Sequence, residues 1–147
     1  MRGLQVNDPS GDIAERELRN LGHNVVIRKI LPDEVSRIRD EIRRLIDDSK
    51  IDIIITIGGT GLTSDDVTIE AVTPLLDKIL PGFGEIFRYL SYREVGSLAI
   101  LSRAIAGISR DKVIFCLPGS VNAVKLAINM LIGPLLPHLL YLLKLRD

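Results

Sequence analysis

The stretch IDIIITIGGTG, residues 51–61, decides the fold that the sequence predicts. Its first seven residues are nearly all β-branched, which is typical of a parallel strand covered on both faces. Gly58 ends this run, and a helix is predicted to begin near residue 67. Because ligands of open α/β sheets bind beyond the carboxyl ends of strands, the turn GGTG is the first candidate site.

Strands and helices are predicted to alternate through the rest of the chain. Residues 24–30 predict a short strand near a sheet edge, and residues 112–117 predict a second buried strand. Apolar residues at helical spacing predict helices over residues 12–21, 33–48, 67–80, 83–92, 120–132 and from 135. This alternation predicts one α/β domain over residues 1–147 with a layered sheet.

The N-terminal end departs from this scheme. An α/β domain of this kind opens with a strand before its first helix, and residues 1–12 contain no strand-like run. Either the domain is built differently or its first strand is missing from this chain. Loss of a central strand would expose sheet edges, so we expect poor folding unless something else fills the gap.

The composition excludes several classes of function. Lys plus Arg and Asp plus Glu number 19 each, so the chain lacks the basic field of a nucleic-acid binder. The single Cys116 excludes an internal disulfide or a cysteine zinc site, and it fits a reducing cytoplasm. Because Cys116 lies within an apolar strand, we expect it in the core. His23 and His138 have no metal-ligand spacing, and no apolar signal-peptide segment follows Gly3.

The leucine-rich end of the chain raises the question of a membrane span. Polar residues and prolines interrupt the run before it reaches the roughly 20 apolar residues that a span needs. The interrupting residues are Lys125, Asn129, Pro134, Pro137 and His138. We therefore predict a buried or interfacial helix, and a cytoplasmic protein without a membrane partner.

The glycine turn has two interpretations. Glycines at a strand end let backbone N–H groups approach a ligand, and the N-terminus of the next helix favours an anion. Thr60, Thr63 and Ser64 add hydroxyl groups. Alternatively, this is a tight turn in which Ser64 caps the next helix. The turn matches neither the phosphate-binding Walker loop nor the dinucleotide-binding glycine pattern, so its glycines alone leave both interpretations open.

Two acids after the turn favour a metal-bridged phosphate. A carboxylate beside a phosphate site repels the ligand unless a cation lies between them, and Mg²⁺ is commonly held by one or two carboxylates together with substrate phosphates. Asp65 and Asp66 therefore indicate metal-assisted phosphoryl or nucleotidyl transfer. The alternative is that both acids only complement the helix dipole.

Three further segments carry weaker signals. Residues 117–120 form a second turn between a buried strand and a helix, and together the two turns would give one cleft with two anion-binding walls. Asp33 sits at a third such junction, where sequence logic favours an N-cap of the following helix. Ser102 and Arg103 could place a guanidinium near the cleft, although a surface position is commoner for arginine.

Taken together, six segments resemble the MoaB/Mog family of molybdenum cofactor biosynthesis proteins, the molybdopterin adenylyltransferases. They occur in the family's order and cover almost the whole chain. The segments are DPSG at 8–11, PDE at 32–34, GGTG at 58–61 with Thr63 and DVT at 66–68, PGFGE at 81–85, LSRA at 101–104, and PGS at 118–120.

The resemblance implies a three-layer α/β fold with a mostly parallel sheet, assembled as a homotrimer or hexamer. It also implies transfer of AMP from Mg·ATP to the terminal phosphate of molybdopterin, with release of pyrophosphate. The family's catalytic aspartates fall on Asp33 and Asp66, and Asp66 is expected to hold Mg²⁺. The residues implied to bind the phosphorylated ligands are Gly58, Gly59, Thr60, Gly61, Thr63, Ser102, Pro118, Gly119 and Ser120.

Some residues depart from the family's pattern. The family commonly has a basic residue at the position of Asp65 and a proline at that of Val121, and its first strand has no counterpart in residues 1–12. Two alternatives stay open. A nucleotide hydrolase similar to the competence-damage-inducible, CinA-like proteins would explain Asp65 better, and a non-catalytic molybdopterin-binding or scaffold protein would explain the missing strand. The sequence does not distinguish a molybdenum from a tungsten pathway.

Overall fold

A four-stranded sheet forms the centre of the structure, a computed structural model that describes residues 7–145. The strand order is β1-β4-β3-β2, with bounds β1 Ile53–Ile57, β2 Lys78–Ile79, β3 Ile105–Ser109 and β4 Lys112–Leu117. β1 and β4 are parallel, whereas β3 is antiparallel to both β4 and β2. The predicted α/β class is confirmed, but the sheet is mixed rather than mostly parallel, because only two residues join β3 to β4 and so short a link gives a hairpin.

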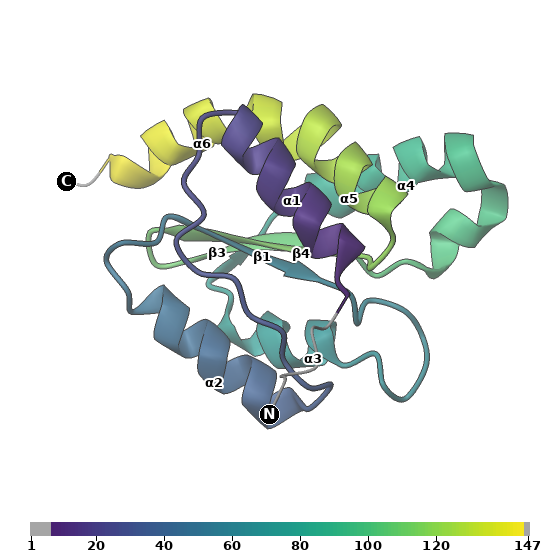
Figure 1. Ribbon diagram of the computed structural model, residues 1–147, viewed down its shortest axis with the longest axis horizontal. Coiled ribbons are helices and arrows are strands. Elements are labelled where there is room, and N and C mark those ends of the chain that lie inside the picture. Colours follow the sequence, from purple (N-terminus) through teal and green to yellow (C-terminus); the bar gives the residue numbers. More distant parts are fainter. Residues whose placement is uncertain (1–6, 146–147) are drawn as a thin grey trace.

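Helices cover both faces of the sheet, which gives three layers (Figure 1). One layer holds α1 (Pro9–Asn20), α4 (Pro81–Val95) and the C-terminal helix, which consists of α5 (Val121–Ala127), the π-helical turn η3 (Ile128–Ile132) and α6 (Gly133–Lys144). The opposite layer holds α2 (Val35–Ile46) and α3 (Thr68–Val72). The 3₁₀ turns η1 (Thr73–Leu75) and η2 (Gly96–Leu101) follow α3 and α4.

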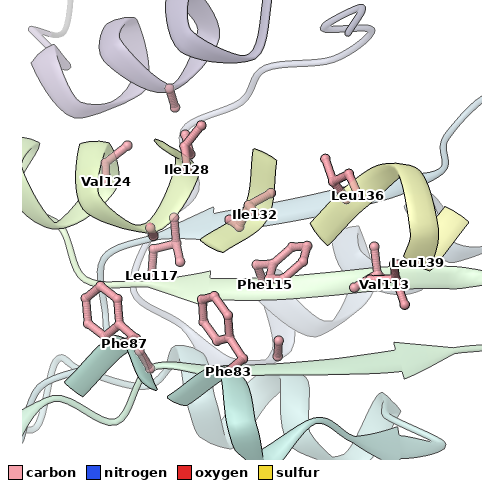
Figure 2. Close-up of a cluster of buried hydrophobic side chains, with 14 of the residues drawn as sticks. Phe83, Phe87, Val113, Phe115, Leu117, Val124, Ile128, Ile132, Leu136 and Leu139 are labelled. Atoms are coloured by element: carbon pink, nitrogen blue, oxygen red, sulfur yellow. The ribbon is translucent and has the colours of Figure 1, made fainter. Parts of the chain in front are cut away.

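Strand β4 belongs to two apolar cores, one on each face of the sheet. Its side chains alternate, so that Phe115 enters the larger core and Ile114 the smaller one. Phe83 packs edge to face on Phe115 with ring centroids 5.2 Å apart (Figure 2). Cys116 points into the smaller core, and burial raises the pKa of its thiol to about 11. This confirms the expectation that Cys116 is a core residue.

The C-terminal helix is continuous from residue 121 to 144, rather than the two helices predicted. Pro134 lies just after the π-helical turn and Pro137 lies inside α6, so the helix continues through two residues that lack an N–H donor. By its length and its mean hydropathy of 1.7 this helix could span a membrane. In this fold the helix belongs to the layer that also holds α1 and α4. Its inner face contributes Val124, Ile128, Ile132 and Leu136 to the larger core (Figure 2).

The predicted strand at residues 24–30 is wrong. The segment links α1 to α2 and crosses between the two helical layers (Figure 1), but it pairs with no strand in the described part of the chain. A strand needs a neighbour for its backbone groups, and a cleft separates this segment from β1, the nearest sheet edge.

The predicted helix at residues 67–80 is also wrong beyond its first turns. Pro74 shortens the helix to α3 and η1. The chain then pairs with β3 instead, since Asp77 N donates to Ile108 O at 2.7 Å and Leu80 N to Ala106 O at 2.8 Å. The sequence predicted neither β2 nor β3, and α4 extends the predicted helix at 83–92 in both directions.

Candidate functional site

Two turns meet at the carboxyl ends of β1 and β4. Gly58 N donates to Leu117 O at 2.8 Å, and a Cβ placed on Gly119 would lie 3.5 Å from the Cα of Gly58. Ser10, in the first turn of α1, donates its hydroxyl to Gly119 O at 2.5 Å. The predicted proximity of the two turns is therefore confirmed, and α1 holds the second turn in place.

Two glycines of the first turn adopt backbone conformations that other residues avoid. Gly58 has φ +98° and Gly59 has φ +73°. Gly59 also packs against Thr68 of α3: its O accepts from Thr68 N at 3.1 Å, and an added Cβ would lie 2.1 Å from Thr68 Oγ1. The chain can therefore make this turn close to α3 only with glycine at position 59.

Thr63 holds the carboxylate of Asp66. Thr63 donates both its N–H and its hydroxyl to Asp66 Oδ2, at 2.9 Å and 2.8 Å. These bonds, with smaller contributions from the Gly61 backbone and Arg103, lower the pKa of Asp66 below its ordinary value of 3.8. Because both Thr63 bonds go to Oδ2, the second oxygen of this half-buried carboxylate can serve another ligand.

Arg103 fastens the glycine-rich loop from the other side. Its guanidinium donates to Gly61 O at 3.0 and 2.7 Å and to Asp66 O at 3.1 Å, and it forms an ion pair with Glu70. Its own N–H donates to Thr60 O at 3.1 Å. The guanidinium is therefore bound to the loop backbone, which was not predicted.

Two predicted hydroxyl groups are already used within the protein, and a third lies on a buried residue. Thr60 is buried, with 3% of its surface exposed. Ser120 caps α5 by accepting from Ala123 N at 3.1 Å, and Ser102 Oγ accepts from Ala104 N at 3.4 Å. The prediction that Ser64 caps a helix is wrong, because α3 begins later and its N-cap position is Val67.

Asp33 is not the N-cap residue that its position in the sequence predicts. The N-cap position of α2 is Glu34, so the N-cap interpretation of Asp33 is wrong. Asp33 is exposed, has no hydrogen bond or ion pair within residues 7–145, and lines a cleft of about 770 Å³. Gly58 and Gly59 line the same cleft. Asp33 and the glycine turn thus both belong to the lining of this large cleft.

The remaining predicted residues lie outside this cleft. Asp66, Thr63 and the second turn do not line it, and Asp65 is exposed without a partner among the described residues. Within the same residues no group of three or more His, Cys, Asp or Glu side chains could hold a metal ion. A cation here would therefore need oxygen ligands from a substrate as well as from Asp66.

Comparison with known proteins identifies the family. A family model described as a probable molybdopterin binding domain matches residues 3–138. Molybdenum cofactor biosynthesis protein B from Staphylococcus carnosus is 48% identical over 139 residues, which cover 91% of this chain and 80% of that protein. A crystal structure of molybdenum cofactor biosynthesis protein B superposes with a TM-score of 0.91 at 44% identity, covering 96% and 89% of the two chains. The chain belongs to the MoaB family.

Membership in the MoaB family places the chain in molybdenum or tungsten cofactor biosynthesis. The tungsten cofactor synthesizing protein MoaB from Pyrococcus furiosus superposes with a TM-score of 0.83 at 41% identity, covering 97% and 89% of the two chains. A CinA protein from Thermoplasma acidophilum has a TM-score of 0.63 at 17% identity, covering 92% and 90%, so that likeness shows the fold alone. The comparisons thus favour MoaB over a CinA-like hydrolase.

The residues that sequence reasoning missed in this MoaB chain are those that hold others in place. Thr68 of α3 bonds the glycine turn, Glu70 of α3 pairs with Arg103, and Ser10 reaches the second turn from 109 positions away. The motifs contained two of these residues, since DPSG includes Ser10 and DVT includes Thr68. Their partners could not be inferred, because the contacts depend on how distant segments pack.

Proposed function

We propose that this MoaB protein binds molybdopterin at Gly58–Gly61 and transfers AMP to it from ATP. An oxygen of the terminal phosphate of molybdopterin attacks the α-phosphorus of ATP and forms a new P–O bond. The bond from that phosphorus to the bridging oxygen of the β-phosphate breaks, and pyrophosphate leaves. The observation that carries the proposal is the fixed carboxylate of Asp66 within the loop that follows the two glycines.

The two turns suit two phosphorylated ligands. Phosphoryl-type transfer requires mainly that the reacting groups be positioned and their charges neutralised. Gly58 and Gly59 have no side chains to hinder the approach of a phosphate to the backbone, and Ser120 begins a helix of 24 residues whose N-terminus favours an anion. We assign molybdopterin to the first turn and ATP to the second.

Asp66 and Asp33 are the residues that would hold Mg²⁺. When bound, the ion neutralises phosphate charge in this type of transfer. Thr63 keeps Asp66 in one orientation, and the low pKa of Asp66 keeps it ionised at neutral and mildly acidic pH. Asp33 has no partner within the described chain, so it can turn toward a ligand without breaking a contact.

The direct test is turnover by the purified protein with molybdopterin, ATP and Mg²⁺. We expect adenylylated molybdopterin and pyrophosphate to form in equal amounts, over many turnovers, as measured by mass spectrometry and a pyrophosphate assay. Molybdopterin bound at one equivalent without any product would contradict the proposal. That result would instead favour a non-catalytic binding or scaffold protein.

We also propose that the protein is a homotrimer, or a hexamer built from two trimers. An exposed apolar surface on α4 and η2 supports this assembly, since a single domain rarely leaves so many large apolar side chains in water. We call it the α4–η2 surface; its members are Ile86, Tyr89, Tyr92, Val95, Leu98, Ile100 and Leu101.

The assembly can be tested with a matched pair of variants. Ile100→Asp puts a charge on the α4–η2 surface, where the side chain is 73% exposed, whereas Ile79→Asp places it on β2, at the outer edge of the sheet. By light scattering after size exclusion we expect about three or six times 16.3 kDa for the natural protein and Ile79→Asp. Ile100→Asp should be smaller, and an unchanged mass for it would exclude this surface as the interface.

A further inference from the structure

We propose that Ser10 is a positioning residue for the nucleotide of the adenylyl transfer. Its hydroxyl group holds the peptide unit between Gly119 and Ser120 in one orientation, in which the Ser120 N–H points toward the phosphate groups of ATP. The inference rests on the function proposed above, which assigns ATP to this second turn. It adds a role for α1, which that assignment leaves without one.

The hydrogen bond of Ser10 joins a buried hydroxyl group to an exposed turn. Ser10 lies in the first turn of α1 and is 7% exposed, whereas Gly119, whose O accepts at 2.5 Å, is an exposed residue. A buried hydroxyl group needs a partner, and serine in a helix can find one in the backbone of its own helix. Ser10 bonds instead to a turn 109 positions away, so it fixes that turn against α1.

The peptide unit between Gly119 and Ser120 is held by this bond alone within residues 7–145. Before it, Leu117 O accepts a hydrogen bond from the first turn, and after it, Ser120 O accepts from Val124 N at 3.1 Å. Gly119 O between them accepts only from Ser10. Because glycine allows a wide range of backbone angles, this peptide unit could rotate without the bond. Ser10 therefore selects its orientation.

The orientation of the Gly119 carbonyl group also fixes the Ser120 N–H. In a planar trans peptide the C=O and N–H groups point in opposite directions. Because Gly119 O points to α1, the Ser120 N–H points away from α1. This N–H donates to no protein group in the described chain. An oriented N–H without a protein acceptor, at the start of the C-terminal helix, suits a phosphate oxygen of the nucleotide.

The first turn of α1 is itself held in place. Asp8 caps the helix by accepting from Gly11 N at 3.0 Å, and Pro9 follows it, where the fixed φ of proline suits a helix start. Arg28 donates to Asp8 O at 3.2 Å and to Asp8 Oδ2 at 3.0 Å. The backbone of Ser10 is therefore fixed, as a side chain that positions another group requires.

A matched pair of variants tests the inference. Ser10→Ala removes the hydroxyl group. Ser109→Ala is the control, because Ser109 is 5% exposed, its side chain has no hydrogen bond in the described chain, and it lies at the opposite end of the sheet from the second turn. In Ser10→Ala the Kd and the KM for Mg·ATP should rise about fivefold or more. The kcat and the KM for molybdopterin should change less than about twofold, because the first turn is intact. Ser109→Ala should change none of these constants by more than about twofold.

Calorimetry measures the Kd for ATP without turnover, and ¹⁵N relaxation of the Ser120 amide in the free protein should show greater mobility in Ser10→Ala only. The inference is overturned if Ser10→Ala binds ATP as tightly as the natural protein, if Ser109→Ala weakens ATP binding equally, or if the natural protein binds no ATP. A natural protein that binds ATP but forms no adenylylated product contradicts the proposed function instead. The Kd values of the two variants then still decide the role of Ser10.

Discussion

At the scale of single residues, the candidate site depends on side chains that hold other groups in place. Thr63 fixes Asp66, and Arg103 binds the backbone of the same loop. Asp66 could be predicted because an acid beside a phosphate-type turn has a chemical reason to be there. The role of Arg103 could not, since it depends on contacts with Gly61 and Glu70, which lie 42 and 33 positions away.

Thr63→Val should raise the pKa of Asp66. The variant removes the hydroxyl donor, the largest cause of the lowered pKa, and keeps the side-chain volume. A carboxylate whose pKa is lower in the folded than in the unfolded protein stabilises the folded state at pH values above the unfolded-state pKa. This contribution to stability is lost as the pH falls through the pKa of the folded state. The variant should therefore lose less stability in acid. Carboxyl NMR titration measures the pKa, and an unchanged midpoint would contradict the account.

Arg103→Gln should loosen the glycine-rich loop. The variant removes charge-assisted hydrogen bonds to Gly61 O and Asp66 O, and we expect about 1–2 kcal/mol of lost stability because the side chain is one-third exposed. Arg37→Gln is the control, since Arg37 is exposed and has no partner in the described chain, and it should change stability by less than about 0.5 kcal/mol. Urea unfolding measures both. Equal effects would mean that Arg103 does not brace the loop.

At the scale of secondary structure, prediction succeeded where the signal is local and failed where it depends on a neighbour. β1 and α2 follow from a β-branched run and a helical repeat within their own residues. Residues 24–30 have strand-like composition but no ladder, and residues 78–79 have little strand character yet pair with β3. For such short segments, the presence of a sheet edge decides the outcome.

Replacing Gly59 and Gly82 by alanine should have different effects on stability. In Gly59→Ala the new Cβ would lie 2.1 Å from Thr68 Oγ1, and the residue would have to adopt a positive φ. We therefore expect the free energy of unfolding to fall by about 2 kcal/mol or more. Gly82→Ala lies in the first turn of α4 with nothing within 4 Å of its Cβ, and it should leave stability unchanged or raise it by up to about 1 kcal/mol. Denaturant midpoints compare them. A stable Gly59→Ala protein would mean that the turn does not need glycine there.

At the scale of the whole molecule, the site consists of segments that the fold collects from most of the chain. Ser10 of α1, the turn at Gly58 and Gly59, Arg103 before β3 and Gly119 after β4 converge at the carboxyl ends of the two parallel strands. The sequence predicted that the two turns lie together, because both follow buried strands, but it did not predict the contacts of Ser10 and Arg103. Within residues 7–145 β1 is an end strand of the sheet, and this appears only once the strand order is known.

The most direct test of the proposed adenylyl transfer compares two neighbouring aspartates in one assay. Asp66 is held by Thr63, whereas Asp65 is exposed without a partner in the described part of the chain. In turnover of molybdopterin with ATP and Mg²⁺, Asp66→Asn should lower the rate by about a hundredfold or more with an unchanged melting temperature. Asp65→Asn should stay within about threefold of the natural protein, because it removes no positioned ligand. An Asp66→Asn rate near that of the natural protein, or equal losses in the two variants, would contradict the account.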